Sequence, residues 1–352
     1  MRQSRKLDHL NICRKMADGP GTTGFADFHP VHNCLPELAW DDVRLDTEIA
    51  GIHLRHPLII NAITGGAADV AAVNAALAEL ALTTGAAMAV GSQYAALENP
   101  EVLGSYEVIR EVNPGGVLFA NVGAHVTPEQ ACQAVEMIGA DALQVHLNAG
   151  QELVMPEGDR NFSRYLEHIA AIAARCRVPV IAKEVGCGIA REQALALTGA
   201  GVRAIDVGGR GGTNFLAIEA ARGQNELEED FLAWGIPTAV SAAEVAAALE
   251  RRADLIVSGG VRSSLDALKA LIIGGQAVAV AGPLVKLLNG AGPQGAIAWV
   301  EAFLEGLKRC MVLVGAGKVS ELAGVPLVIT GWSREWLTAR GVDVTRYAVR
   351  PS

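Results

Sequence analysis

One repeated pattern between residues 57 and 290 limits the possible folds more than any other feature of this chain. A short apolar run is followed by a polar or glycine-containing turn and then by a helical stretch. The runs show little alternation of apolar and polar residues, which is typical of parallel strands buried on both faces. They span residues 57–62, 86–91, 117–121, 142–148, 178–183, 204–208, 254–258 and 277–281. Eight such units predict a (β/α)8 TIM barrel, with an open doubly wound sheet as the alternative.

The remaining chain divides around this barrel. We expect a single domain with an N-terminal extension over 1–56, the barrel over 57–290 and C-terminal helices over 291–352. Helices are predicted over 69–84, 128–138, 165–174, 191–198, 242–251 and 264–273. The longest connection, 209–230, follows the sixth strand and is expected to build or cover the functional site.

Composition excludes several classes of protein. Hydrophobic residues make up 51% of the 352 residues, which is enough for a large core and excludes a disordered chain. The formal net charge of −9 argues against nucleic-acid binding. The six cysteines form no CxxC pair, which predicts core residues in a reducing compartment rather than a zinc or disulfide framework. The chain shows no signal-peptide pattern and no apolar run of membrane-spanning length, so we expect a cytoplasmic protein without membrane contact.

The carboxyl ends of the predicted strands carry the candidate chemistry, because active sites of such barrels lie at that end. Lys183 ends an apolar strand, and burial of an unpaired ammonium is costly, so an anionic ligand is expected beside it. The last two strands end in Ser258-Gly-Gly-Val-Arg262 and Ala281-Gly282, which predict a phosphate site. The alternative is that these glycines serve only tight turns.

A second polar group follows the fourth strand. His146 and Asn148 precede Gln151, Glu152 and the turn Glu157-Gly-Asp-Arg160. Carboxylate and amide oxygens suit Mg²⁺, and with Arg5 and Lys6 they would bind a diphosphate. An ion-paired turn that only shapes the loop is the alternative. The sequence contains no nucleophile elbow, HExxH motif, P-loop or Rossmann fingerprint.

These residues together resemble the type 2, FMN-dependent isopentenyl-diphosphate delta-isomerases along nearly the whole chain. The most specific segments are Arg5-Lys-Leu-Asp-His9, Gln144-Val-His-Leu-Asn148, Pro156-Glu-Gly-Asp-Arg-Asn-Phe162, Ala182-Lys-Glu-Val-Gly186 and Gly209-Arg-Gly-Gly-Thr-Asn-Phe215. The resemblance implies FMN, reduced by NADPH, together with Mg²⁺, a prenyl diphosphate substrate and a homo-oligomer. It also implies isomerisation of isopentenyl to dimethylallyl diphosphate by adding and removing protons, without net redox change.

The same resemblance implies a role for individual residues. The implied FMN contacts are Ala62, Ile63, Thr64, Ser92, Asn121, Lys183 and Thr213 at the ring and ribityl chain, and Gly259, Gly260, Arg262, Ala281 and Gly282 at the phosphate. The implied substrate contacts are Arg5, Lys6, Ser92, Gln93, Tyr94, Asn148 and Gln151. Glu152 is the implied Mg²⁺ ligand, and His9, His146 and Gln151 are the candidate catalytic residues.

One position departs from the family pattern. The second strand of relatives usually ends in Ser-Gln-Arg, whereas this chain has Ser92-Gln93-Tyr94 and so lacks a bidentate cation. Either Arg5, Lys6 and Mg²⁺ compensate, or the chain is a paralogue acting on another prenylated substrate.

Two further classes remain as alternatives. An FMN-dependent oxidoreductase of the 2-hydroxy-acid oxidase type would need a late histidine, but none follows His168, and Cys187 is a poor candidate for a nucleotide dehydrogenase. The other alternative is a flavin-holding protein without catalysis.

Overall fold

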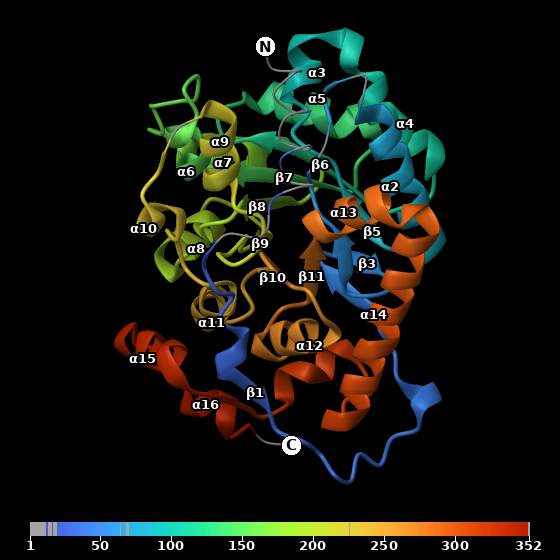
Figure 1. The fold of residues 1–352 in the computed structure, drawn as a ribbon, viewed down its shortest axis with the longest axis vertical. Helices are drawn as coiled ribbons and strands as arrows, with labels where there is room; N and C mark the ends of the chain where they lie inside the picture. Colours follow the sequence, from blue (N-terminus) through green and yellow to red (C-terminus); the bar gives the residue numbers. More distant parts are fainter. Residues whose placement is uncertain are drawn as a thin grey trace.

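The centre of the molecule is a closed barrel of eight parallel strands (Figure 1). This computed structural model describes residues 12, 16, 20–63, 65–67, 70–224 and 226–350. In barrel order the strands are β4 (Leu58–Ile60), β5 (Ala87–Ala89), β6 (Leu118–Gly123), β7 (Ala142–Leu147), β8 (Val180–Glu184), β9 (Ala204–Asp206), β10 (Asp254–Ser258) and β11 (Ala277–Val280). β11 pairs with β4 and closes the ring, which confirms the predicted barrel and excludes the open sheet.

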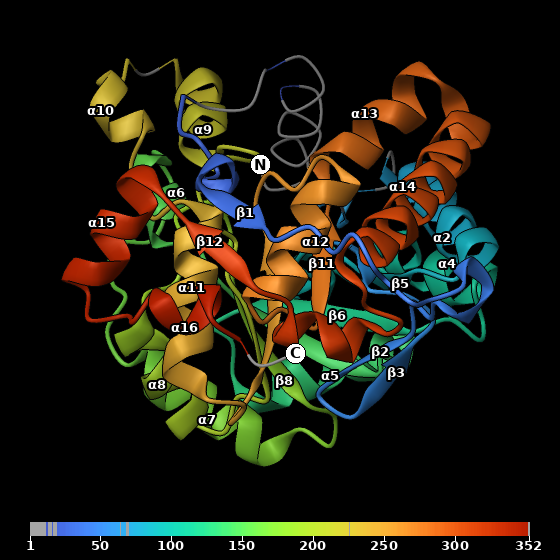
Figure 2. The ribbon, with the colours of Figure 1, turned by 90° about the horizontal axis from the view of Figure 1, so that it is seen from below.

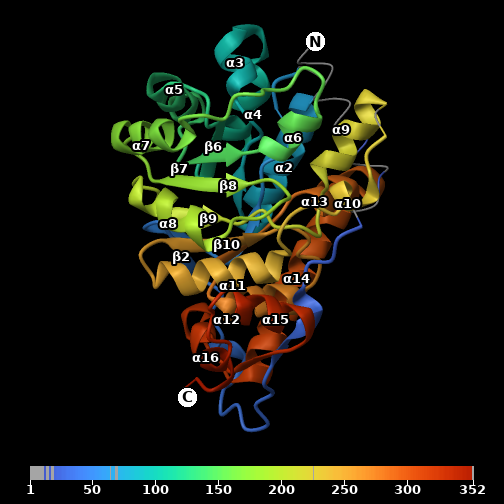
Figure 3. The same ribbon diagram turned by 90° about the vertical axis from the view of Figure 1, so that its left-hand side faces the viewer.

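Helices surround this barrel, and Figure 3 shows the strands pointing toward the side on which α6, α9 and α13 lie. The helices are α2 (Ala71–Thr84), α3 (Tyr94–Glu98), α4 (Gly104–Val112), α5 (Pro128–Ile138), α6 (Ala149–Val154), α7 (Tyr165–Arg175), α8 (Arg191–Gly199), α9 (Phe215–Gly223), α10 (Glu229–Leu232), α11 (Thr238–Leu249), α12 (Ser264–Ile273), α13 (Gly282–Gly290), α14 (Gly292–Val314), α15 (Gly331–Ala339) and α16 (Thr345–Ala348). α5 shows why local sequence sets these bounds. Thr127 and Gln130 form a capping box at its start, and Gly139 ends it with a φ of 55°.

The barrel interior changes from apolar to polar along the strands. An apolar cluster near the strand starts includes Ile59, Phe119, Ala142, Ile181 and Ile256. Because alternate residues of a strand face the same side, the next inward positions lie two residues further along. We call the buried residues at the carboxyl-terminal part of the strands the polar ring: Asn61, Asn121, Gln144, Lys183, Asp206 and Ser258.

A β-hairpin closes the amino-terminal end of the barrel. Its strands, β2 (Thr47–Ile49) and β3 (Ile52–Leu54), pair antiparallel around a two-residue turn in which Ala50 and Gly51 both have positive φ. Ile49 and Leu54 belong to the apolar cluster of the barrel interior. The hairpin is also tied down by the Ala50 N–H, which donates to Asp254 Oδ2 over 2.6 Å. The amino-terminal end of the barrel is therefore closed by packed side chains.

The two ends of the chain meet outside the barrel. β1 (Phe28–Pro30) pairs antiparallel with β12 (Leu327–Ile329), and Figure 2 shows the two strands side by side. The tail packs on the barrel helices through α15, where the Trp336 indole donates to Glu244 Oε1 on α11 over 2.6 Å. Within the part of the chain that the structure describes, no helix combines the length and the apolar character that crossing a membrane requires.

Candidate active site

A cavity of about 820 Å³ opens at the carboxyl ends of the strands. The predicted site residues that line it are Ala62, Ile63, Ser92, Tyr94, Asn121, His146, Asn148, Gln151, Glu152, Lys183, Thr213, Gly259, Gly260, Arg262, Ala281 and Gly282. Arg5, Lys6, His9 and Thr64 lie outside the described residues. The long connection after β9 lines the cavity with Phe215 and Arg222 of α9, as the sequence predicted for a loop of that length.

One predicted residue does not line this cavity. The Gln93 side chain is fully buried behind the wall, where its amide donates to Ala134 O and accepts from the Asn121 N–H. The expectation that Gln93 contacts substrate is therefore corrected: the side chain braces β6 against α5. A sequence motif gives the spacing of residues along the chain but not the direction in which each side chain points.

The turn after β10 is built from backbone. Gly259 and Gly260 have φ values of 106° and 75°, and a Cβ atom on Gly259 would lie 2.2 Å from Gly209 O. Side chains are therefore excluded here because the loops after β9 and β10 pack backbone against backbone. Arg262 braces the same loops by donating to Gly211 O over 2.5 Å and to Gly260 O over 3.0 Å.

Helix α13 begins beside this turn. Its N-cap residue, Ala281, provides no side-chain hydrogen bond to the first turn of the helix. Exposed backbone N–H groups, a helix amino terminus and a guanidinium are the groups that hold a phosphate in barrels of this type. The geometry fits the predicted phosphate site, although tight packing also requires the glycines.

Lys183 has a partner within the protein. Its ammonium lies 3.1 Å from Asp206 Oδ2, and both side chains are almost completely buried. Lys183 is therefore not unpaired as the sequence suggested: Asp206 supplies the opposite charge, so burial of this ammonium does not by itself require an anionic ligand. Lys183 nevertheless lines the cavity, so it carries a paired positive charge at the centre of the mouth.

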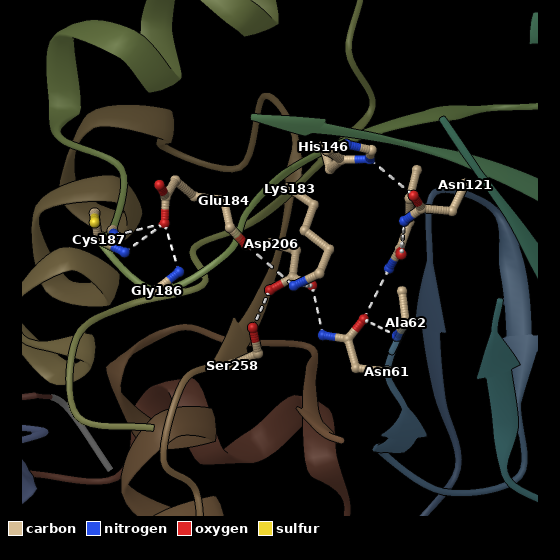
Figure 4. A network of polar contacts seen from close by, with 12 residues as sticks. Asn61, Ala62, Asn121, His146, Lys183, Glu184, Gly186, Cys187, Asp206 and Ser258 are labelled. Atoms are coloured by element: carbon tan, nitrogen blue, oxygen red, sulfur yellow. Dashed lines mark hydrogen bonds and ion pairs between the residues drawn. The ribbon is translucent and has the colours of Figure 1, made fainter. Parts of the chain in front are cut away.

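Glu184, the next residue, holds the loop that follows β8. Its Oε2 accepts the N–H groups of Gly186, Cys187 and Gly188 at 2.7, 2.5 and 3.0 Å (Figure 4). Burial raises the pKa of Glu184 to about 7, and these N–H groups limit the rise because they stabilise the charged form. This carboxyl fixes the wall of the cavity at Gly186.

Cys187, which follows Gly186 of this wall, is not a reactive thiolate. Burial raises the pKa of the Cys187 thiol to about 12, which keeps it protonated at neutral pH. The prediction that cysteines are core residues is wrong for Cys34, which is exposed. The Sγ atoms of Cys132 and Cys176 lie 3.3 Å apart, a contact between α5 and the end of α7 that spacing along the chain does not show.

Gln151 is oriented by a buried carboxylate. It lies on the short helix α6 rather than in a loop, and its Nε2 donates to Glu219 Oε1 over 2.8 Å. Glu219 is fully buried on α9 and also accepts from Arg222 Nε over 2.7 Å. Because an ionised carboxylate only accepts hydrogen bonds, the carbonyl oxygen of Gln151 must face away from Glu219 and toward Asn148.

Glu152, the predicted metal ligand, lies on the same helix. Its carboxylate accepts from Asn148 Nδ2 and from the Asp159 N–H, each over 2.9 Å. The neighbouring Arg160 donates to backbone carbonyls, including Met155 O at 2.8 Å, and so shapes the turn without a carboxylate partner among the residues that the structure describes. The described residues contain no cluster of three His, Cys, Asp or Glu side chains suited to a metal ion. A Mg²⁺ ion here would take its remaining ligands from substrate and water.

The cavity includes a histidine and an arginine that the sequence analysis did not assign to the site. His125 packs edge-on against Tyr94, with ring centroids 4.7 Å apart. Arg222 brings a guanidinium to the rim, 2.7 Å from Glu157 Oε1. Their positions carry weak signals, since His125 follows β6 by two residues and Arg222 is three residues after Glu219 on a helix.

The fold and the cavity define a class, a (β/α)8 barrel with a phosphate-type turn at its mouth. Residues 120–327 match the FMN-dependent dehydrogenase family. A mandelate oxidase solved with (S)-2-phenylpropionate has a TM-score of 0.67 at 18% identity, covering 93% of this chain and 97% of its own, which shows a likeness of fold.

Closer relatives place the chain within that class. An isopentenyl-diphosphate delta-isomerase from Symbiobacterium thermophilum is 49% identical over 99% of both chains. The corresponding protein from Moorella thermoacetica is 48% identical over 96% of this chain and 97% of its own. The chain belongs to the isopentenyl-diphosphate delta-isomerase family.

Proposed function

We propose that this protein isomerises isopentenyl diphosphate to dimethylallyl diphosphate with reduced FMN and Mg²⁺. The observation that carries the proposal is a single cavity that holds a phosphate-type turn, a buried lysine, and the polar residues His146, Gln151 and Glu152. This arrangement occurs in a chain that is 49% identical to a named isomerase over almost its full length. NADPH as reductant, a homo-oligomer and a cytoplasmic location belong to the same proposal and rest on the resemblance.

The cavity residues fit FMN. Gly259, Gly260, Arg262 and the start of α13 would hold its phosphate, because N–H groups and a guanidinium gather where side chains are excluded. Ala62, Ile63, Asn121 and Lys183 would contact the ring. When bound in its reduced form, FMN supplies an electron-rich ring whose charge a nearby cation stabilises. Lys183 can provide that cation while Asp206 keeps it in place.

The other side of the cavity fits a diphosphate ester. Glu152 would hold Mg²⁺ together with substrate oxygens, and Asn148 orients the Glu152 carboxylate. Arg5 and Lys6 are proposed to add positive charge. Apolar residues Ile63, Met155, Val185 and Phe215 also line the cavity and would exclude water around the isoprenyl carbons.

The reaction requires a proton to be added at one alkene carbon and removed from another. His146 and the carbonyl oxygen of Gln151 are the candidate groups of this chain for holding a proton beside the substrate, with His9 as a third candidate. The Gln151 amide is held by Glu219, so its acceptor oxygen has a defined direction. We therefore expect His146→Gln to lower turnover more than FMN binding.

The experiment supplies isopentenyl diphosphate and Mg²⁺ to the FMN-loaded, reduced protein and measures dimethylallyl diphosphate. Glu152→Gln should lower kcat/KM by about 100-fold, as expected when a metal ligand is lost, while the bound flavin spectrum stays unchanged. Glu157→Gln, which removes a carboxylate from the same rim, should have a smaller effect. Absence of product with reduced flavin bound would overturn the proposal. Unchanged turnover in Glu152→Gln would overturn the metal assignment alone.

A further inference from the structure

A chain of buried hydrogen bonds runs from Asp206 to His146 across the barrel interior. Asn61 Nδ2 donates to Asp206 Oδ2 over 2.9 Å, and Gln144 Nε2 donates to Asn61 Oδ1 over 3.2 Å. Asn121 Nδ2 donates to Gln144 Oε1 over 3.0 Å, and Asn121 Oδ1 lies 2.9 Å from His146 Nδ1. Figure 4 shows Asp206, Asn61, Asn121 and His146 along this path.

The direction of the chain is fixed at the Asp206 end. The Asp206 carboxylate accepts a hydrogen bond from Ser258 Oγ at 2.5 Å and forms an ion pair with Lys183 Nζ at 3.1 Å, and a carboxylate in an ion pair only accepts hydrogen bonds. Asn61 must therefore turn its NH₂ group toward Asp206. The Ala62 N–H, which donates to Asn61 Oδ1 over 2.9 Å, enforces the same orientation from the other side.

Each amide passes this constraint to the next. With Asn61 Oδ1 as acceptor, Gln144 must present its NH₂ group to Asn61 and its oxygen to Asn121. Asn121 must then present its NH₂ group to Gln144 and its oxygen to His146. Turning all three amides around would place Asn61 Oδ1 against Asp206 Oδ2 and Asn61 Nδ2 against the Ala62 N–H. Both contacts are repulsive at these distances, and they are not screened by bulk solvent because Gln144 and Asp206 are fully buried.

We infer that Asp206, Asn61 and Gln144 are positioning residues that keep the proton of His146 on Nδ1. An oxygen facing Nδ1 requires a proton there, and the ring nitrogen that is bonded in this way decides the tautomer. Neutral His146 then carries its lone pair on Nε2. A carboxylate at the strand end of β9 thus selects the acid–base form of a cavity residue on β7.

The inference rests on the proposed function only where it concerns catalysis. The position of the proton on His146 can be measured without turnover, so the two can be tested separately. Histidine labelled with ¹³C and ¹⁵N is incorporated into the full-length, FMN-loaded protein, and His146→Gln identifies the His146 signals by their loss. The ring chemical shifts report which nitrogen is protonated. We expect His146 to carry its proton on Nδ1, and a neutral ring protonated on Nε2 would overturn the inference.

Gln144→Met tests the chain of hydrogen bonds between Asp206 and His146. Methionine has a similar volume and no amide, so Asn121 would lose the contact that sets its orientation. We expect mixed tautomers of His146 and a fall in kcat/KM of about 10- to 100-fold, the range seen when a group that orients a site residue is lost. Gln93→Met is the matched control, because Gln93 is an equally buried amide that contacts Asn121 only through its backbone. It should leave the tautomer unchanged.

A rescue variant separates orientation from general packing. In Gln144→Met combined with Asn121→Asp, a carboxylate faces His146 and can only accept, so the Nδ1 proton should return. Gln144→Met protein with an unchanged tautomer would overturn the inference, and so would failure of the double variant to restore the Nδ1 proton. If Gln144→Met does not fold, the tautomer of the parent and of the single Asn121→Asp variant, both expected to be protonated on Nδ1, still decide the matter. Absence of isomerase activity with the expected tautomers would count against the proposed function and not against the inference about the hydrogen-bond chain.

Discussion

The two ends of the barrel use the same strands for opposite purposes. At the amino-terminal end, Ile49 and Leu54 of the β2–β3 hairpin pack on an apolar interior cluster. At the carboxyl-terminal end, each residue of the polar ring lies two positions after an apolar residue of that cluster, on the same inner face of the strand. A strand thus contributes a stabilising residue and a functional residue to the same inner face, one step of its pleat apart.

The difference teaches where stability and function reside in this chain. Buried apolar side chains contribute stability in proportion to the area removed from water, and a similar side chain could replace them. The residues of the polar ring are costly to bury, and each is retained with a partner that satisfies it. We therefore expect changes at the hairpin to alter stability alone and changes in the polar ring to alter both.

The largest effect is expected for Lys183→Ala. It leaves the fully buried Asp206 without its cation, and removal of one partner of such a pair costs about 3–5 kcal/mol. Loss of the cavity cation should also weaken FMN retention. Denaturant unfolding and the ratio of bound flavin to protein measure the two effects. The double variant Lys183→Met with Asp206→Asn should recover stability without recovering FMN; full flavin binding in either protein would remove Lys183 from its proposed role.

Leu54→Ala is the counterpart at the closed end. Truncation of this buried side chain should lower the free energy of unfolding by about 2–4 kcal/mol, because it removes apolar contact and leaves a cavity. Urea unfolding measures the change. The kcat/KM of the folded variant should equal that of the parent, since the hairpin lies at the opposite end of the strands. A lowered kcat/KM with intact flavin binding would contradict the separation of the two ends.

Glu184→Gln sharpens the comparison through pH. Burial raises the pKa of Glu184 to about 7, so the folded state favours the protonated carboxyl, and this contribution to stability is lost as pH rises from about 4.5 through 7. The glutamine does not titrate. The free energy of unfolding of the variant minus that of the parent should rise by at most about 3 kcal/mol over this pH range, at 1.36 kcal/mol per pKa unit. Parallel stability curves from pH 4.5 to 8 would show that Glu184 does not titrate in this way.

The smallest effect is expected for Tyr94→Arg. Tyr94 lies at the cavity wall against His125, and the family resemblance leads us to expect arginine at its position. A guanidinium there would add a charge-assisted hydrogen bond to a diphosphate and lower KM for isopentenyl diphosphate about 10-fold, equivalent to about 1.4 kcal/mol. Steady-state kinetics with Tyr94→Phe as control measures the change. A KM unaffected by the arginine would place the diphosphate away from residue 94.

Much of the fold follows from the sequence. The eight strands were predictable because strands buried on both faces leave continuous apolar runs, and the longer helices because of residues such as Thr127 and Gly139. The hairpin at 47–54 and the pairing of β1 with β12 were not, because these strands are only partly buried and most of them carry polar residues such as Glu48 and His53 instead of a continuous apolar run. The second of these also joins segments that are about 300 residues apart.

The sequence predicted which residues belong to the site better than it predicted which of them contact each other. Strand ends converge in any barrel, so motifs at those ends pointed to the cavity. The partner of Lys183 and the orientation of Gln93 depend on neighbours from other strands, and nothing near them in the sequence reveals these neighbours. Gly208 illustrates the same limit: it has a φ of 46°, and a Cβ there would lie 1.8 Å from Glu184 O. Any residue with a Cβ atom at this position would therefore require the loop to shift.

The β1–β12 ribbon also has a consequence for synthesis of the protein. Phe28 emerges from the ribosome early, but its strand partner Ile329 is made only near the end of translation. The whole barrel can therefore form before Phe28–Pro30 gain their strand partner. A product terminated before residue 327 would retain every strand of the barrel yet leave Phe28–Pro30 without a partner strand.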